Sequence, residues 1–291
     1  MYTLILAWTL IALGGSIFFW MLCGKYIFIL VSFLIPPLIL VKNTFKFKMS
    51  MARKTSYALI FCTLFFFFCT AYYRCSNKEA LDLEVFLEAL QKQYPQEYQR
   101  IVTEPSPKPN TRFCSTCKLL KTGRIHHCRV CRKCLLSYDH HCPWLNACVG
   151  AHNYHLFYLM SLYGTLLSGY ISSVLIAHLF LDYLYPSCSA SPPKECKNVF
   201  DELDLATLMA LSFCIILSMI VFFGLGFFAV DYLRVICQNA TMLDHFAGQK
   251  PPLMHNLRRV FGDRIVLWLL PLDLPIKHTG FFTGELEELV L

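Results

Sequence analysis

The chain has 291 residues and a formal net charge of +7, and 56% of its residues are hydrophobic whereas only 15% are charged. About a quarter of the residues of a soluble domain are charged, so this composition excludes an ordinary soluble protein. Together with long uncharged runs, it predicts a polytopic membrane protein.

The N-terminal part, 1–73, consists of apolar segments. Residues 1–24 carry no charge and are long enough to cross a bilayer, which takes about 20 residues. A shorter apolar run, 26–41, is followed by a basic loop, 42–54, and by an uncharged, phenylalanine-rich run, 55–73, that is just long enough to span. We therefore expect 1–73 to hold the N-terminal transmembrane segments.

The next segment, 74–113, is polar and predicts a cytosolic helix and a linker. Apolar residues recur at helical spacing between acidic ones, at Leu83, Phe86, Leu87 and Leu90. Alternating prolines over 105–109 then predict an extended connection into the cysteine-rich stretch that follows.

Two further uncharged runs, 156–181 and 205–230, follow the cysteine-rich stretch 114–155 and are long enough to span. They are separated by a polar loop, 182–204, and followed by a tail, 231–291. Each span changes the side of the membrane. If the cysteine-rich stretch is cytosolic, the loop 182–204 is therefore luminal and the tail is cytosolic again. Neither run contains Asp, Glu, Lys or Arg, and His178 within the first run is expected to be a hydrogen-bonded structural residue, so a channel or transporter is a weak interpretation.

The stretch 114–155 concentrates the chemistry of the chain. Between Cys114 and Cys148 lie seven of the fifteen cysteines together with four histidines. Thiolate and imidazole are the ligands that zinc prefers, and repeated C-x-x-C steps have the spacing of tetrahedral sites. Two zinc ions need eight ligands, so six cysteines and two histidines would leave one cysteine over for chemistry. We find no internal repeat in the chain.

Basic residues surround these cysteines, and the stretch lies between membrane spans. Both facts bear on whether the cysteines form disulfides and whether the stretch binds nucleic acid. A disulfide cluster is disfavoured, because basic flanks beside membrane spans indicate the reducing cytosolic side. Nucleic acid is disfavoured as a partner, because the stretch lies between membrane spans. Membrane lipids with anionic headgroups are the expected partners of this surface.

The pattern C-x2-C-x9-H-C-x2-C-x2-C-x4-D-H-H-C-x5-C resembles the cysteine-rich domain of the DHHC protein S-acyltransferases, or palmitoyltransferases. The similarity continues through 143–146, and it returns in a C-terminal element over 256–262. The family's Thr-Thr-x-Glu element aligns with Thr241-Met242-Leu243-Asp244, where Met242 replaces a threonine and Asp244 shortens the glutamate.

The resemblance implies two structural zinc ions, each bound by three cysteines and one histidine. The implied ligands are Cys114, Cys117, His127 and Cys134 for the first zinc and Cys128, Cys131, His141 and Cys148 for the second. It also implies acyl-CoA as co-substrate. The basic surface would attract the CoA phosphates, and the candidate residues for this contact are Arg124, Arg129, Arg132 and Lys133.

The leftover thiol is Cys142, and the resemblance assigns it as the nucleophile. Thiolate is the reactive form, and an ordinary thiol is mostly protonated at neutral pH. His140 is expected to take the proton, and Asp139 to hold that imidazole in the right tautomer. His141 cannot also be the base if it binds zinc.

The resemblance predicts a protein S-acyltransferase that moves a long-chain acyl group, such as palmitoyl, from acyl-CoA through a Cys142 acyl-enzyme. The expected acceptors are membrane-proximal cysteines of protein substrates, at the endoplasmic reticulum or Golgi, with the zinc domain cytosolic. The alternative is a membrane adaptor that has lost catalysis. The altered Thr241–Asp244 element favours the adaptor, and the intact Asp139-His140-His141-Cys142 motif opposes it.

The expected fold is therefore an all-α polytopic membrane protein with a cytosolic double-zinc module. Two full spans within 1–41, followed by a third span, would place the basic loop 42–54 on the non-cytosolic side, against the positive-inside rule. Members of the family commonly have two spans before the cysteine-rich domain. We therefore expect about four transmembrane helices, with one effective span within 1–41, or the same arrangement with one extra N-terminal apolar segment.

Overall fold

The computed structural model describes residues 51–93, 95–96, 98–99, 112–121, 124–150, 152–180, 205–238, 240 and 252–272. The expected span within 1–41, the loop 182–204 and the Thr241–Asp244 element lie outside these residues, as does the chain beyond 272. The described chain forms two compact units. The first contains 51–68 with 161–227, and the second contains 69–160 with the chain from Phe228 onward.

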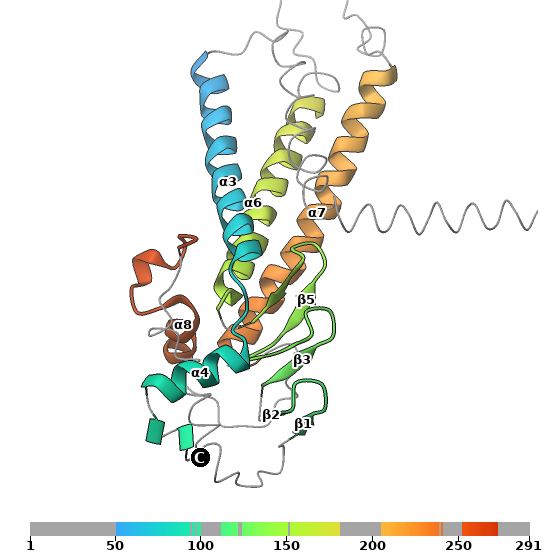
Figure 1. The fold of residues 1–291 in the computed structure, drawn as a ribbon. Coiled ribbons are helices and arrows are strands. Elements are labelled where there is room, and N and C mark those ends of the chain that lie inside the picture. The colour runs from blue at the N-terminus through green and yellow to red at the C-terminus, as the bar shows by residue number, and fades with distance from the viewer. Residues whose placement is uncertain are drawn as a thin grey trace, which may run out of the picture. The chain divides into compact units, whose positions relative to one another are not determined.

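Three long apolar helices are present in the described residues (Figure 1): α3 (Met51–Asn77), α6 (Tyr154–His178) and α7 (Leu205–Cys237). Each contains a stretch long and apolar enough to cross a membrane, namely Thr55–Asn77, Tyr154–Ala177 and Leu208–Cys237. The expectation of a helical membrane protein is thereby confirmed, with three candidate spans in this part of the chain. Helix α7 continues to Cys237, beyond the uncharged run that ends at Val230.

In the first unit, the three helices pack through small residues and rings. Gly169 of α6 lies against the Phe222 ring of α7, so closely that an added Cβ would come within 2.8 Å of it. The buried hydroxyl of Ser172 donates a hydrogen bond to Ser218 Oγ at 2.8 Å. Since membrane helices gain little from the hydrophobic effect, close packing and such polar bonds are the ordinary means of association.

The second unit contains the short helix α4 (Leu83–Gln93), whose apolar face is buried as its spacing predicts. Leu83, Phe86 and Leu90 pack in one core with Ile125 and Leu136 of the cysteine-rich stretch. Asp82 begins the helix, because its Oδ1 accepts a hydrogen bond from the Glu84 backbone N–H at 3.1 Å. Helix α8 (Leu253–Phe261) and the 3-10 turn η4 (Ile265–Leu267) belong to the same unit.

Three antiparallel hairpins make up the cysteine-rich stretch (Figure 1). They are β1 (Arg112–Cys114) with β2 (Leu119–Lys121), β3 (His126–Cys128) with β4 (Lys133–Leu135), and β5 (His140–Cys142) with β6 (Ala147–Val149). The sequence pattern had not indicated these strands. Each is only three residues long, which is too short for a period-two signal.

The hairpins repeat one another, so the expectation of no internal repeat was wrong. Cys114, Cys128 and Cys142 end the first strand of successive hairpins and pair in register with Leu119, Lys133 and Ala147. In each turn one residue takes a left-handed conformation, namely Lys118 (φ 58°), Arg132 (φ 57°) and Asn146 (φ 49°). The repeat is also present in the sequence, since His126-His127-Cys128 recurs as His140-His141-Cys142, but each unit is only 14 residues long.

Candidate functional site

The first hairpin and the second together form a group of potential metal ligands. The ligand atoms of Cys114, Cys117, His127 and Cys134 all lie within 4.8 Å of one another. His127 Nδ1 is 3.5 Å from Cys114 Sγ, 3.3 Å from Cys117 Sγ and 3.8 Å from Cys134 Sγ. A tetrahedral zinc site with ordinary Zn–S and Zn–N bonds separates sulfur from nitrogen by about 3.5 Å. The four residues therefore fit a zinc ion.

The second hairpin and the third form a second group with the same composition. It consists of Cys128, Cys131, His141 and Cys148, again within 4.8 Å of one another. His141 Nδ1 lies 3.9 Å from Cys128 Sγ and 3.5 Å from each of the sulfurs of Cys131 and Cys148. The structure thus brings together the eight residues that the sequence pattern singled out, as two Cys3His clusters suitable for metal binding.

The hairpin turns prepare the first cysteine of each C-x-x-C step for a metal. The backbone N–H of Cys117 donates to Cys114 Sγ at 3.5 Å, and that of Cys131 donates to Cys128 Sγ at 3.4 Å. The Cys117 N–H is the main cause that lowers the pKa of Cys114, to about 7. Burial alone would raise the pKa of Cys128, but hydrogen bonds, led by the Cys131 N–H, outweigh it and lower that pKa. Thiolate is the form that binds zinc.

The third hairpin has the same backbone but lacks the second cysteine. Leu145 stands at the position that Cys117 and Cys131 occupy in the other two hairpins, and its side chain is fully buried. Cys142 therefore has no C-x-x-C partner, and it belongs to neither metal cluster. This explains physically which of the seven cysteines is left over.

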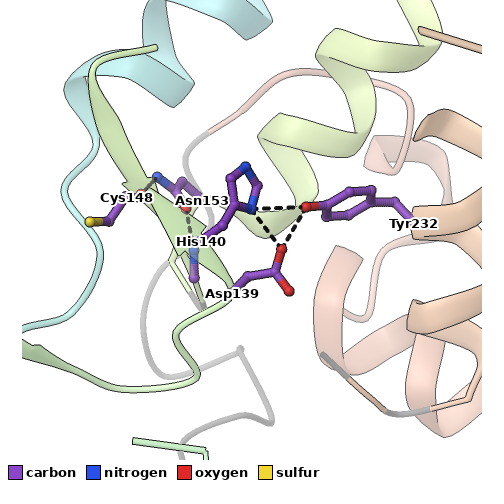
Figure 2. Close-up of polar contacts among 6 residues, drawn as sticks. Asp139, His140, Cys148, Asn153 and Tyr232 are labelled. Atoms are coloured by element: carbon purple, nitrogen blue, oxygen red, sulfur yellow. Dashed lines mark hydrogen bonds and ion pairs between the residues drawn. The ribbon is translucent and has the colours of Figure 1, made fainter. Parts of the chain in front are cut away.

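Beside Cys142, the Asp139 carboxylate and the His140 imidazole form a close pair (Figure 2). His140 Nδ1 is 2.9 Å from Asp139 Oδ2. The Asp139 side chain is fully buried, whereas 36% of the His140 side chain is exposed. Burial opposes the charged imidazolium, but hydrogen bonds and charge from Asp139 and Cys142 outweigh it and raise the pKa of His140 to about 9. With Nδ1 directed to the carboxylate, Nε2 is the nitrogen available to a thiol proton.

A residue that the sequence did not single out completes this pair. The hydroxyl of Tyr232, near the end of α7, donates a hydrogen bond to Asp139 Oδ2 at 2.5 Å and lies 3.2 Å from His140 Nδ1. Its ring packs on Phe157, with centroids 4.7 Å apart, and on Tyr154 at 5.2 Å. In the sequence, Tyr232 is only the second residue of the tail that follows the uncharged run 205–230, and no spacing rule connects it with Asp139.

Asn153 ties the third hairpin to the end of α3. Its Nδ2 donates to the backbone oxygen of Cys148 at 2.9 Å (Figure 2) and to that of Lys78 at 2.9 Å, and its Oδ1 accepts from the Gly150 N–H at 3.0 Å. Asn153 is fully buried. Since buried backbone groups need partners, this one side chain satisfies backbone groups of the turn, of β6 and of the end of α3 at once.

The four basic residues proposed for the CoA phosphates all lie in the second unit. Arg129 and Arg132 are exposed in the turn between β3 and β4, and Lys133, also exposed, begins β4. Lys133 Nζ is 3.4 Å from Asp82 Oδ2, so part of its charge is already matched. Arg124 is half-buried before β3.

The helices and the site define an integral membrane protein that carries two Cys3His metal clusters and, outside both, a thiol beside an Asp–His pair. The DHHC palmitoyltransferase family model matches residues 107–249. The chain is also 29% identical over 249 residues to palmitoyltransferase ZDHHC15 of Xenopus laevis, a match that covers 76% of this chain and 69% of that protein. The chain belongs to the DHHC palmitoyltransferase family.

Membership of this family makes the protein a palmitoyltransferase, an enzyme of protein S-palmitoylation that uses acyl-CoA. The resemblance and the enzyme class expected from the sequence are confirmed. The adaptor and the transporter are correspondingly disfavoured. The roles of single residues, the organelle and the cytosolic position of the module stay predictions.

Proposed function

We propose that Cys142 is the residue that carries the acyl group between acyl-CoA and the protein substrate. Its thiolate attacks the thioester carbonyl of a long-chain acyl-CoA, for which palmitoyl-CoA is the natural choice in this family. The observation that supports this most is the position of Cys142, which lies outside both metal clusters and next to the Asp139–His140 pair.

His140 handles the proton in both halves of the reaction. In the first half it takes the proton of the Cys142 thiol, a carbon–sulfur bond forms, and the bond to the CoA sulfur breaks. CoA leaves as a thiol once it has received that proton. In the second half the acceptor cysteine gives its proton to His140 and attacks the acyl-enzyme, and Cys142 leaves as thiol. A thioester replaces a thioester at each step, so no other energy source is needed.

Asp139 keeps His140 in the productive tautomer. Its buried carboxylate accepts the Nδ1 proton, which leaves Nε2 to serve as the base. The same carboxylate stabilises the imidazolium that forms when the thiol is deprotonated, and the pKa of about 9 for His140 agrees with that role. An active site of this kind needs a buried residue that orients the base, here Asp139, and an accessible base, here His140.

The two Cys3His clusters hold structural zinc in this proposal. Each provides four protein ligands, and a closed tetrahedral site leaves no position for a substrate. Zinc, when bound, supplies folding free energy to hairpins whose strands are only three residues long. Exposed basic residues of the same module, Arg129, Arg132 and Lys133, together with half-buried Arg124, would attract the CoA phosphates.

The location of the reaction follows from the same charges. A basic module beside membrane spans favours the cytosolic side, where acyl-CoA and reduced thiols are available. The acceptors are proteins with membrane-proximal cysteines, because a module anchored by flanking helices reaches only the bilayer surface. We propose the endoplasmic reticulum or Golgi membrane as its place in the cell.

The test is acylation of the purified full-length chain in detergent with alkyne-labelled palmitoyl-CoA. We expect a label that hydroxylamine removes, since hydroxylamine cleaves thioesters. Cys142→Ser should abolish the label, whereas Cys62→Ser, which changes an exposed cysteine on α3, should keep it. A Cys142→Ser chain that is labelled as well as the wild type would refute the proposal.

A further inference from the structure

We propose that Tyr232 is a positioning residue for acyl transfer, and this inference rests on the function proposed above. Its hydroxyl, the Asp139 carboxylate and the His140 imidazole form a triangle of polar contacts, drawn with dashed lines in Figure 2. The role of Tyr232 is to hold Asp139 against His140 Nδ1, so that Nε2 faces Cys142.

The hydrogen bond from the Tyr232 hydroxyl to Asp139 is the strongest contact that Tyr232 makes with the pair. The distance of 2.5 Å between the Tyr232 hydroxyl and Asp139 Oδ2 is that of a hydrogen bond to an ionised oxygen. Only 2% of each residue is exposed, so water does not compete for the bond. The same oxygen, Oδ2, receives the proton of His140 Nδ1, and the tyrosine oxygen lies near enough to share that proton.

The Tyr232 ring is fixed by its neighbours, which is what a positioning residue needs. It lies between Phe157 and Tyr154, at centroid distances of 4.7 and 5.2 Å. Phe157 also meets the edge of the His140 imidazole at 5.4 Å. One aromatic group thus holds both the tyrosine and the base, and the hydroxyl cannot turn away from the carboxylate without moving the whole group.

Asp139 is held from two directions. Its backbone N–H donates to the oxygen of Val149 in β6 at 3.0 Å, which fixes the main chain. The Tyr232 hydroxyl donates a hydrogen bond to Oδ2, which helps to hold the carboxylate against His140 Nδ1. The Asp139 carboxylate then holds the Nδ1 side of the His140 imidazole, while part of that side chain stays exposed.

Tyr232→Phe separates positioning from packing, because it removes the hydroxyl and keeps the ring. The control is Tyr158→Phe, which removes a hydroxyl from a second tyrosine of the same unit; Tyr158 is half-buried and packs on Phe261 rather than on the Asp–His pair. Both variants would be compared with the wild type and with Cys142→Ser as full-length, zinc-loaded chains.

The measurement is the single-turnover rate of acyl-enzyme formation over a range of palmitoyl-CoA concentrations, together with zinc content. We expect Tyr232→Phe to keep two zinc ions and the half-saturating concentration, while the maximal rate falls about tenfold or more, as for loss of one hydrogen bond to a charged group. Tyr158→Phe should match the wild type. A packing role alone would not lower the maximal rate at unchanged half-saturation.

A double variant gives the second readout. In an Asp139→Asn background, Tyr232→Phe should lower the rate less than twofold further, because the two residues act through one contact. A wild-type rate for Tyr232→Phe, or the same loss with and without Asp139→Asn, overturns the inference. Labelling of Cys142→Ser would instead overturn the proposed function.

Should Tyr232→Phe fail to accumulate, 3-fluorotyrosine at position 232 keeps ring and hydroxyl and alters only the strength of the donor. The maximal rate should then change at least twofold, relative to the same replacement at position 158. An unchanged rate overturns the inference.

Discussion

His140 and His141 are neighbours in β5, and their imidazoles belong to different groups. His140 Nδ1 lies 2.9 Å from Asp139 Oδ2, whereas His141 Nδ1 lies 3.5 Å from the sulfurs of Cys131 and Cys148. Successive residues of a strand point to opposite sides, so a strand of three residues is enough to separate a base from a metal ligand.

Replacing these two histidines should therefore give different defects. We expect His141→Ala to lose one zinc per chain together with expression and acylation, because one cluster lacks a ligand. His140→Ala should keep both zinc ions and normal abundance but lose acyl-enzyme formation. Zinc analysis of the two purified variants checks the division. Equal zinc loss in both would contradict it.

Cys142 and Cys148 provide the same contrast among the thiols of the third hairpin. Structural zinc supplies on the order of 10 kcal/mol of folding free energy in small modules, more than a marginal domain can lose. We expect Cys148→Ala to lower zinc content, expression and activity together. Cys142→Ser should keep two zinc ions and near-normal abundance without an acyl-enzyme. A Cys148→Ala chain that stays active with two zinc ions would disprove the ligand assignment.

The metal clusters and the Asp139–His140 pair could be predicted because their residues are close in sequence. Zinc geometry restricts ligand spacing, and adjacent residues cannot lie far apart. Tyr232 could not be predicted, since its partner Asp139 is 93 residues away and the contact depends on how α7 packs. Likewise hydropathy ends the last span at Val230, but hydrogen bonding carries the helix on to Cys237, with Val235 and Ile236 buried.

Asn153 should be among the most sensitive structural residues of the second unit. Asn153→Ala leaves buried backbone partners at Gly150 and Cys148, and a part-buried one at Lys78, without their hydrogen bonds. At about 1–3 kcal/mol for each unsatisfied group, we expect a loss of at least several kcal/mol. Asn153→Asp keeps the acceptor for Gly150 but loses the two donors, so it should be destabilised as well. Thermal unfolding of zinc-loaded chains measures both; a wild-type midpoint for Asn153→Ala would contradict the role of this side chain.

His152 should make stability depend on pH. Burial, with a smaller effect of the Lys78 charge, lowers the pKa of His152 from 6.5 to about 4, and its Nε2 has no hydrogen-bond partner among the described residues. The unfolded chain therefore binds more protons than the folded chain between pH 6.5 and 4. Stability from this group is complete above pH 6.5 and is lost as the pH falls toward 4.

The measurement is the unfolding midpoint of wild type and His152→Leu across that range. Both chains share the acid sensitivity of their metal ligands, so only the difference between them reports on His152. We expect the wild-type midpoint to fall more steeply. Parallel curves would show that this imidazole does not contribute.

Gly169 and Gly224 should respond in opposite directions to the same substitution. A Cβ at Gly169 would meet two atoms of the Phe222 ring at 2.8 and 2.9 Å, whereas one at Gly224 would meet nothing within 4 Å. Overpacking typically costs about 1–3 kcal/mol, and alanine in a helix is favoured over glycine by up to about 1 kcal/mol. We expect Gly169→Ala to lower the unfolding midpoint in detergent and Gly224→Ala to leave it unchanged or raise it. Because the helix propensity gain is common to both, the difference between the two midpoints isolates the contact between α6 and α7. Equal shifts would mean that the Phe222 ring moves aside at little cost and that Gly169 is not needed for this packing.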